Sequence, residues 1–405
     1  MRRAVAWLRT PEAVRQRCHA LLALAEQDRL PHFTLHADQL DEVADFVAQV
    51  TRENYPDLAI PYHSRWRHFE IGGIDRWSVL ADSVAGPAGE RARVRLELCT
   101  ISVLLDAGAG PDWRFHERET GQSWGRSEGL AIASIAAFRA GLFSGDPRQA
   151  LRVDAEGLSR ITEARLAHAL QVAAANPLTG LAGRAALLRS LGAALRRQPQ
   201  LFGPEARLGR LFDAWRDHAA ERALSARDIL LTLLECFATI WPRRPTLGGE
   251  NLGDVWPHAA LDSPEPGAAL VPFHKLSQWL CYSLVEALEQ SAIPVQELDA
   301  LTGLAEYRNG GLFIDGGVLQ LRDPVLANTP LPPEHAAVVE WRALTVALLD
   351  RLAPLLRHRL GRSERELPLA CVLQGGTWDA GRQLARERRT DGSPPIAVLS
   401  DGSLF

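Results

Sequence analysis

Apolar residues recur every three or four positions along most of this chain, which is the spacing of one face of an α-helix. Strand candidates are confined to 396–399 and a short piece around 312–321. We therefore expect a mainly α fold with few short strands. The pattern predicts helices over about 10–27, 38–51, 91–106, 128–138, 225–237, 271–288 and 333–360, and a helical region over 146–200 with breaks at Gly157 and around Asn176-Pro177.

Residue types at the helix starts support these boundaries. Thr10 and Ser127 are expected N-caps, because a hydroxyl accepts a hydrogen bond from a free N–H of the first turn. Pro272 suits a first helical turn, where a missing N–H costs little. Glu340 and Arg342 lie within the apolar part of the helix predicted over 333–360, where unpaired charges would be costly. We see neither an internal repeat nor a low-complexity linker. We therefore expect a single domain over 1–405, in two lobes of about 1–265 and 266–405 around one cleft.

The predicted helix over 271–288 carries polar side chains near its start. His274, Lys275 and Gln278 lie on or beside the apolar stripe. A basic side chain at such a place can face a cleft. The alternative interpretation is that the charge is a solvated surface group, as for most lysines.

A second polar group follows shortly after this helix. Glu306, Tyr307 and Arg308 are consecutive, and the glycine pairs Gly310-Gly311 and Gly316-Gly317 come next. Glycines permit sharp turns and a close approach of the backbone to a ligand. The carboxylate here and the lysine of the preceding helix could share a site, or both could be solvated.

The segment Y-P-D-L-A-I-P-Y-H-S-R-W-R-H-F-E lacks a helical period and holds two prolines. Its aromatic and charged groups, among them Trp66, His68 and Glu70, suit a pocket wall on an ordered loop. The alternative is a loop whose aromatic side chains plug the core. His63, His68 and Glu70 do not have an established zinc spacing, so we expect no metal site.

Another candidate lies where Gly125 precedes a helix of small residues. Arg126 with Ser127 at a helix start would suit a phosphate or a carboxylate, because free N–H groups at helix N-termini bind anions. Glu128 follows directly. The alternative is a cap beside one solvated arginine.

Composition narrows the classes of function. The chain has 405 residues, of which 46% are hydrophobic and 23% charged, with a net charge of −4. These values do not indicate nucleic acid or a membrane as the main partner. No apolar run reaches the length of a membrane span, and the N-terminus does not resemble a secretory signal. Five scattered cysteines without a C-x-x-C motif favour buried thiols in a reducing cytoplasm.

Five segments together resemble the uracil-catabolism family of fungi and bacteria. They are F-H-K-L-S-Q-W, L-T-G-L-A-E-Y-R-N-G-G, H-S-R-W-R-H-F-E, S-V-L-L-D-A-G-A-G and G-R-S-E-G-L. The resemblance runs from about Thr10 to Phe405. That family belongs to a pathway that degrades uracil through a ribosylated urea, so the resemblance implies a role in pyrimidine degradation.

A more distant resemblance is to the queuosine-salvage proteins, which hydrolyse the N-glycosidic bond of a 5′-phosphorylated ribonucleoside. Their Phe-Tyr-Lys-x-x-Gln and Ala-Asp-Tyr-Arg stretches match F-H-K-L-S-Q and A-E-Y-R here, in the same order. Lys275 and Glu306 then fall on that family's active-site lysine and acid. Glu306 replaces Asp, His274 replaces Tyr, and Asn309-Gly310 replaces Val-Pro, which indicates a different substrate. The resemblance implies a two-lobed helical fold like that of the helix-hairpin-helix DNA glycosylases.

These resemblances imply an N-glycosidase that acts on a ribosylurea-type substrate and releases urea. Breaking a ribosyl C–N bond creates an oxocarbenium-like sugar, which a carboxylate such as Glu306 stabilises. Lys275 would hold a ribose hydroxyl or the acid, and His274 or Lys275 would protonate the leaving nitrogen. Arg126, Arg308 or His68 would take a 5′-phosphate. The expected substrate-binding residues are Trp66, His68, Glu70, Arg126, Glu128, Gln278, Tyr307, Arg308 and Asp315.

Two other functions remain open at this point. An amidohydrolase on the same intermediate would need a metal or a nucleophile and base, for which the scattered His and Cys residues give no clear set. A non-catalytic protein could instead bind a uracil-derived metabolite. We expect a small ribosyl or nucleoside-derived molecule as the partner and neither a metal nor an organic cofactor.

Overall fold

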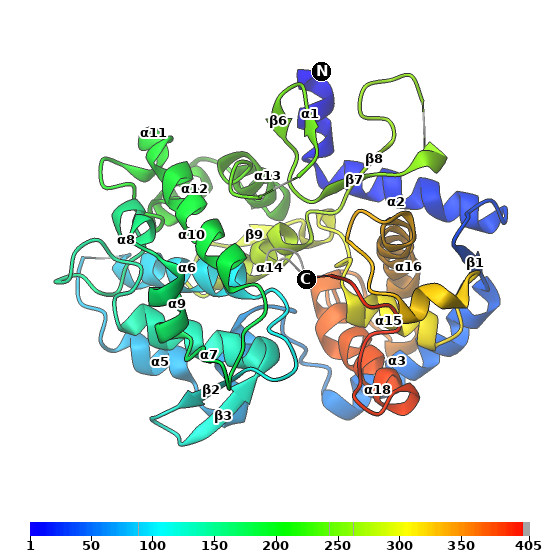
Figure 1. The fold of residues 1–405 in the computed structure, drawn as a ribbon, viewed down its shortest axis with the longest axis horizontal. Helices are drawn as coiled ribbons and strands as arrows, with labels where there is room; N and C mark the ends of the chain where they lie inside the picture. The colour runs from blue at the N-terminus through cyan, green and yellow to red at the C-terminus, as the bar shows by residue number, and fades with distance from the viewer. Residues whose placement is uncertain (88, 243, 262, 400–405) are drawn as a thin grey trace. The chain divides into compact units, whose positions relative to one another are not determined.

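The computed structural model describes residues 1–87, 89–242, 244–261 and 263–399, and helices dominate them, as predicted (Figure 1). The resemblance to DNA glycosylases stays a prediction. The helices are α1 (Arg2–Leu8), α2 (Pro11–Glu26), α3 (Leu40–Asn54), α4 (Trp66–Phe69), α5 (Arg76–Ala81), α6 (Glu90–Leu105), α7 (Arg126–Arg139), α8 (Ala155–Ser159), α9 (Glu163–Ala169), α10 (Leu181–Arg196), α11 (Pro199–Phe202), α12 (Arg210–Glu221), α13 (Ala226–Cys236), α14 (Lys275–Glu289), α15 (Tyr307–Asp315), α16 (Ala336–Leu360), α17 (Leu369–Val372) and α18 (Trp378–Arg388).

The strands are short and pair two by two within the described residues. Four pairs are antiparallel, β1 with β10, β2 with β3, β5 with β6 and β7 with β8, and the β4–β9 pair is parallel. Their bounds are β1 (Phe33–Leu35), β2 (Arg114–Glu117), β3 (Gln122–Gly125), β4 (Leu224–Ser225), β5 (Thr246–Leu247), β6 (Glu250–Asn251), β7 (Val255–Pro257), β8 (Leu270–Pro272), β9 (Val295–Gln296) and β10 (Leu319–Leu321).

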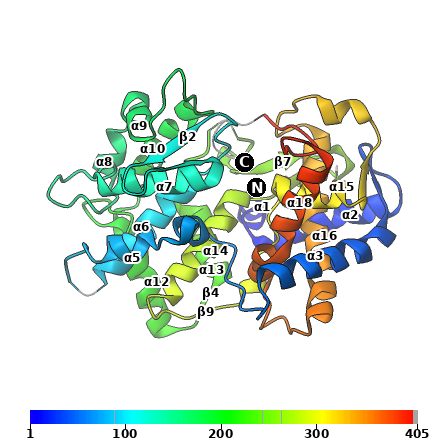
Figure 2. The ribbon, with the colours of Figure 1, turned by 90° about the horizontal axis from the view of Figure 1, so that it is seen from below.

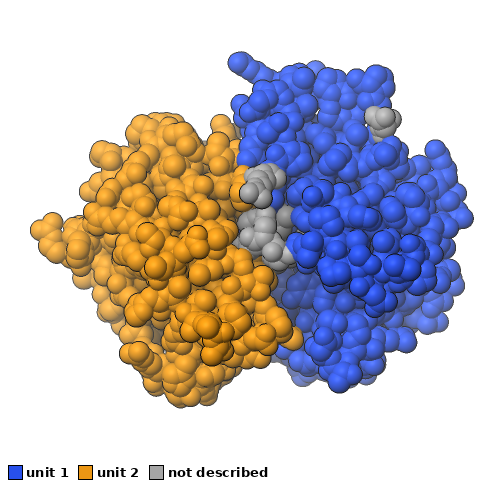
Figure 3. Space-filling model, in the orientation of Figure 1, with its two compact units in different colours: residues 1–63, 244–278, 297–399 blue, residues 64–243, 279–296, 400–405 orange. Residues whose placement is uncertain are grey.

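The described residues fall into two compact units, which Figure 3 colours separately. Unit 1 contains those of Met1–His63, Arg244–Gln278 and Glu297–Leu399, and unit 2 contains those of Ser64–Arg243 and Trp279–Gln296. The division between them falls within α14. The expected lobes of about 1–265 and 266–405 around one cleft stay a prediction.

Unit 1 is built around the long helix α16. This helix packs against α2, α3 and α15, and α18 lies along α15 (Figures 1 and 2). Most of α16 is buried, including Trp341, Leu344 and Leu348. α15 approaches its neighbours closely, because a Cβ on Gly310 would lie 2.7 Å from the Trp341 ring and a Cβ on Gly381 would lie 2.2 Å from the Arg308 carbonyl oxygen. A larger residue at either glycine would therefore push α15 out of place.

Unit 2 is a helical bundle in which α6 is central. It packs against α7, α10 and α12, and α10 packs against α8 (Figure 2). The β2–β3 hairpin lies on α7. The apolar residues of α6 are buried almost without interruption from Leu96 to Leu105. This burial explains why the second half of α6 is mainly apolar on all sides and not along one stripe.

Several predicted helix ends are confirmed and others are wrong. Thr10 caps α2 by accepting the N–H of Ala13, as predicted. Ser127 does not cap α7, because the helix begins at Arg126 and its N-cap is Gly125. The Ser127 hydroxyl donates to Asp106 instead. Pro272 does not open α14 either. It lies in β8, opposite Val255 of β7.

The region 146–200 is less helical than predicted. Residues 146–154 are not helical, and Gly157 lies inside α8. The break around Asn176-Pro177 is confirmed, since α9 ends at Ala169 and α10 begins at Leu181.

The strand and loop predictions hold only in part. The strand around 312–321 is confirmed at β10, whereas residues 312–315 belong to α15. The strand predicted over 396–399 reduces to a single bridge between Val398 and Leu331. The segment predicted as an irregular loop contains the one-turn helix α4, which is too short to show a period.

The five cysteines are buried thiols outside any disulfide, as predicted. Burial raises the pKa of the Cys236 thiol to about 12, so that thiol is protonated at neutral pH. None of the helices in the described ranges combines the length and apolar content needed to cross a bilayer.

Candidate functional site

Glu306 occupies the N-cap position of α15. One of its carboxylate oxygens accepts the backbone N–H of Arg308 at 2.9 Å, and the other accepts that of Asn309 at 2.5 Å. Only 8% of the residue is exposed. Free N–H groups at a helix start favour a negative charge, so this local structure places the carboxylate and holds both oxygens.

The packing around α15 keeps this cap rigid. Asn309 is fully buried, and its side-chain oxygen accepts a hydrogen bond from the Thr377 hydroxyl at 2.9 Å. Thr377 ends a π-helical turn, Leu373–Thr377, that joins α17 to α18. Such turns occur frequently at functional sites.

The electrostatics of Glu306 are unusual for an N-cap. Burial raises the pKa of its carboxyl above the ordinary value, although the Lys275 ammonium and the two backbone N–H groups act in the opposite direction. Lys275 is half-buried and is the first residue of α14. The charge of the predicted lysine is therefore close enough to lower the pKa of the predicted acid. A buried carboxyl with a raised pKa beside a cation has the properties of a general base or a charge stabiliser.

His274 has a strained backbone, and its side chain is held by a hydrogen bond within the protein. Its φ of 49° is left-handed, a conformation that is uncommon for a residue other than glycine. The ring is 2% exposed, and Nε2 donates to the carbonyl oxygen of Leu8 at 2.8 Å. Burial lowers the pKa of His274, so the imidazole is neutral at pH 7.

The other predicted residues of unit 1 contact the protein itself. Gln278 donates to the Thr302 hydroxyl at 2.7 Å and accepts the Thr302 N–H, which ties α14 to the segment before α15. Arg308 is buried and donates to the carbonyl oxygen of Gly392 at 2.9 Å. Asp315 pairs with Arg389 through both terminal guanidinium nitrogens.

Tyr307 is half-buried, and the Arg308 guanidinium lies 5.0 Å from the centre of its ring. The same guanidinium helps to lower the pKa of Glu306 through its charge. Arg308 and Tyr307 thus stand next to the acid on the first turn of α15.

A buried ion pair that the sequence did not assign lies beside this group. Asp254 and Arg342 form a bidentate pair with distances of 2.8 and 2.7 Å. Asp254 also accepts the backbone N–H of Lys275, and Arg342 donates to the carbonyl oxygen of Ala305. Arg342 was recognisable as a charge in an apolar helix, but its partner lies 88 positions away, where no local pattern connects the two.

The predicted residues on α4 belong to unit 2. Trp66 is buried, donates from Nε1 to the Ser283 carbonyl oxygen at 2.9 Å, and packs edge-on against Trp77. This favours the interpretation of Trp66 as a core residue. His68 meets the Trp279 ring edge-on at 5.9 Å. Glu70 is largely exposed and pairs with Arg67 at 3.1 Å.

Arg126 and Glu128 lie in unit 2 around a buried arginine. Arg126 is exposed and has a left-handed φ of 53°. The neighbouring Ser127 accepts a hydrogen bond from Arg65 through its carbonyl oxygen. Arg65 is fully buried and pairs with Asp106 at 3.2 Å. Burial lowers the pKa of Arg65, and the charges of Asp106 and Glu128 oppose that effect.

The predicted site residues therefore form two groups. His274, Lys275, Gln278, Glu306 to Arg308 and Asp315 are in unit 1, and Trp66, His68, Glu70, Arg126 and Glu128 are in unit 2. Their convergence on one cleft stays a prediction. Within the described part of the chain, no three His, Cys, Asp or Glu side chains gather as ligands of a metal would.

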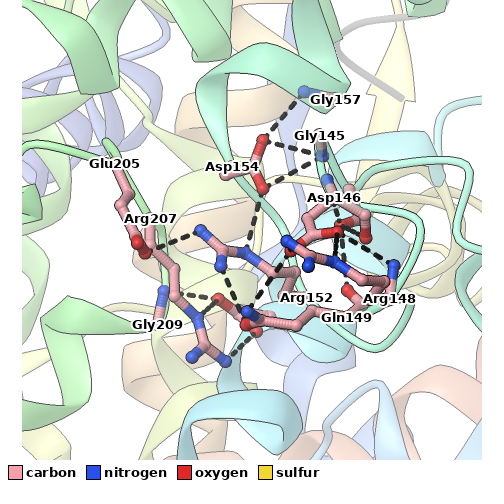
Figure 4. A network of polar contacts seen from close by, with 12 residues as sticks. Gly145, Asp146, Arg148, Gln149, Arg152, Asp154, Gly157, Glu205, Arg207 and Gly209 are labelled. Atoms are coloured by element: carbon pink, nitrogen blue, oxygen red, sulfur yellow. Dashed lines mark hydrogen bonds and ion pairs between the residues drawn. The ribbon is translucent and has the colours of Figure 1, made fainter.

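Unit 2 also contains a hollow of about 780 Å³ lined by arginines, including Arg93, Arg148 and Arg152. Figure 4 shows its polar contacts. Arg152 pairs with Asp154 at 2.9 Å and with Glu205 at 3.0 Å. These arginines hold carboxylates of the protein itself, which favours a structural role.

Comparison with known proteins places this geometry in context. A family model described as "Protein of unknown function (DUF1688)" matches residues 7–405. The protein urg3 of Schizosaccharomyces pombe is 40% identical over 410 residues, which cover 99% of each chain. Uracil catabolism protein 4 of Lachancea kluyveri is 36% identical over 441 residues, again 99% of each chain. The similarity thus extends over both units.

Proposed function

The chain belongs to the family described as "Protein of unknown function (DUF1688)", and from this membership and the Glu306 site we propose that it acts in uracil catabolism as an N-glycosidase. Its substrate is a ribosylurea-type molecule with or without a 5′-phosphate. The reaction hydrolyses the ribosyl C–N bond and releases urea. The name of the Lachancea kluyveri relative supports the pathway, and the site supports the reaction class.

The observation that carries the proposal is the state of Glu306. Its carboxylate is buried, both oxygens are held by backbone N–H groups, and its pKa is raised. A fixed, buried carboxylate whose burial outweighs the charges of Lys275 and Arg308 is stabilised further when a positive charge develops nearby. The sugar of a breaking glycosidic bond supplies that charge in the transition state.

The proposed reaction uses the residues as follows. The C1′–N bond breaks, and the Glu306 carboxylate stabilises the positive charge on the ribose. A water oxygen then bonds to C1′ and passes its proton to Glu306, while the leaving urea nitrogen takes a proton from the Lys275 ammonium. The proton held by Glu306 restores Lys275, so the net reaction consumes one water.

His274 has a different part in this scheme. Its Nε2 proton is bound to the Leu8 carbonyl, and the ring is neutral. We therefore assign the leaving-group proton to Lys275, and assign to His274 the role of orienting the start of α14.

The proposal is tested by incubating the protein with ribosylurea and, separately, with its 5′-phosphate in ¹⁸O-water. We expect urea and the free sugar in equal amounts, with the label at C1′. The Glu306→Gln variant is the control and should form both products about 10²–10³ times more slowly.

Three results would overturn the proposal. Ammonia without urea, with the label in carbon dioxide, would identify an amidohydrolase. Binding without products would identify a metabolite-binding protein. Failure to bind or turn over either compound would remove the substrate assignment.

A further inference from the structure

We infer that Asp254 and Arg342 are positioning residues that set the separation between Lys275 and Glu306. The inference rests on the proposed function. The two side chains form a bidentate pair at 2.8 and 2.7 Å and are 6% and 2% exposed. Neither residue belongs to the segments that carry the proposed catalytic groups, yet the pair contacts both of those segments.

Asp254 holds the start of α14. Its Oδ2 accepts the backbone N–H of Lys275 at 3.1 Å, and its carbonyl oxygen accepts that of Phe273 at 2.9 Å and that of His274 at 3.3 Å. Its Oδ1 accepts the indole N–H of Trp256 at 2.8 Å. The backbone that bears the Lys275 ammonium is thus fixed by one aspartate through three consecutive residues.

Arg342 holds the residue that precedes Glu306. Its Nε donates to the carbonyl oxygen of Ala305 at 3.3 Å, while its two terminal nitrogens hold Asp254. Its guanidinium also lies 4.1 Å from the centre of the Phe273 ring. A single planar group therefore spans the two segments, a task for which the five fixed donors of arginine suit it and the point charge of lysine does not.

The pair is ionised despite its burial. Burial opposes ionisation of Asp254, but the charge and hydrogen bonds of Arg342, with those of Trp256 and the Lys275 N–H, hold the pKa of Asp254 well below its usual range. A buried ion pair stabilises a fold little compared with apolar side chains of similar size. Apolar side chains of the same size could not make the hydrogen bonds by which the pair holds both segments.

The test is the Arg342→Lys variant, which keeps the charge and loses the planar fork. We expect kcat to fall by up to about 10²-fold with a smaller change in KM, since misplaced groups chiefly affect the transition state. The acid limb of the kcat/KM profile, which is the fall in kcat/KM at low pH as Glu306 becomes protonated, should move to higher pH. The reason is that Lys275, less firmly held, would lower the pKa of Glu306 less. Asp254→Asn, which weakens the hold on the Lys275 N–H, should lower kcat as well.

The matched control is Arg207→Lys in unit 2. Arg207 forms a bidentate pair with Glu97 at 2.8 and 3.0 Å, so this variant disturbs a buried pair of the same kind. We expect it to lower the melting temperature without moving the acid limb. A purely structural role for Arg342 would give that same result in Arg342→Lys and would overturn the inference. So would an equal limb shift in both variants.

Glu306→Gln separates this inference from the proposed function. If Glu306→Gln retains the wild-type turnover, the proposed site and the positioning role both fail. If Glu306→Gln is slowed while Arg342→Lys keeps the wild-type kcat and acid limb, only the positioning role fails.

Discussion

Each unit buries an arginine and a carboxylate in a two-bonded pair, Arg342 with Asp254 in unit 1 and Arg207 with Glu97 in unit 2. The two pairs are alike in distance and burial but differ in their surroundings. Arg207 also contacts Glu90, and burial is outweighed by both carboxylates, which raise the pKa of Arg207. Burial nevertheless raises the pKa of Glu97, so it is the set of partners and not the direction of the pKa shift that distinguishes this network.

The pair in unit 1 has a neighbour with a different set of partners. Glu306 is held by backbone N–H groups and not by a bidentate arginine, and burial leaves its pKa raised. A carboxyl with a raised pKa reduces stability wherever it is ionised. The comparison teaches that a carboxylate closed off by bidentate arginine contacts indicates architecture, whereas a buried acid held by backbone N–H groups beside a lysine indicates a working group.

The largest expected effect comes from breaking either pair outright. Arg342→Met and Arg207→Met should each lower the free energy of unfolding by about 3–5 kcal/mol, because each leaves a buried carboxylate without its partner. Denaturant unfolding at pH 7 measures this. Turnover per folded molecule should survive in Arg207→Met and fail in Arg342→Met. Equal turnover in both would erase the distinction between the two pairs.

The same variants should differ from the wild type in their pH dependence. Asp254 has a depressed pKa when folded, so its contribution to stability is present above its unfolded pKa of about 3.9 and declines as pH falls. Without Arg342, burial should raise that pKa above the unfolded value. The stability lost in Arg342→Met should therefore shrink as the pH is lowered from 7 to 5. If the loss of unfolding free energy in Arg342→Met stayed constant from pH 7 to 5, Arg342 would not be the group that keeps Asp254 ionised.

The next effect is on chemistry. Glu306→Gln should lower kcat by about 10²–10³, or roughly 3–4 kcal/mol, because it removes the charge that stabilises the transition state. The melting temperature should fall only moderately, because Gln keeps the size of Glu and one acceptor oxygen but leaves one of the two backbone N–H groups without an acceptor. Single-turnover assays beside thermal melts decide this. A large drop in melting temperature with normal turnover in the surviving protein would mean that Glu306 is only a cap.

A smaller effect is expected from Lys275→Gln. The Lys275 charge lowers the pKa of Glu306, so its removal should raise that pKa and move the acid limb of kcat/KM to higher pH. The kcat should also fall, by about 10²-fold, because Gln cannot donate the proton that the leaving urea nitrogen needs. A full pH profile checks both effects. An unchanged acid limb would show that the Lys275 charge does not act on the pKa of Glu306.

The smallest effect sharpens the comparison inside unit 2. Glu205 pairs with Arg152, but 66% of its side chain is exposed. Exposed ion pairs contribute about 0–1 kcal/mol, so Glu205→Gln should hardly change the melting temperature. A loss as large as that of Arg207→Met would mean that the whole network acts as one unit.

The sequence predicted the existence of the helices better than the residues at which they begin. α2, α3, α13 and α16 follow from periodic apolar residues and their caps, which are local signals. Pro272 and Ser127 were misassigned because tertiary partners decided their roles, a strand partner for Pro272 and Asp106 for the Ser127 hydroxyl.

The candidate site divides in the same way. The resemblance located Lys275 and Glu306, and the structure adds how they are held. That Glu306 caps α15 follows only from the backbone geometry around it. Asp254 carried no local signal, since a carboxylate in a Gly-rich loop is common, and its meaning depends on Arg342 in α16.

Unit 1 is built from segments that lie far apart in the chain, and this has a consequence for synthesis on the ribosome. Helix α2 packs against α16, and Arg15 pairs with Asp350 across 335 positions of the chain. At translation rates of about 5–20 residues per second, roughly 15–60 s pass between the emergence of the two helices. During that interval the apolar face of α2 lacks its native cover, while most of unit 2 is being made. A nascent chain that stops before Ala336 would keep that face exposed, which makes it a natural target for chaperones and proteases.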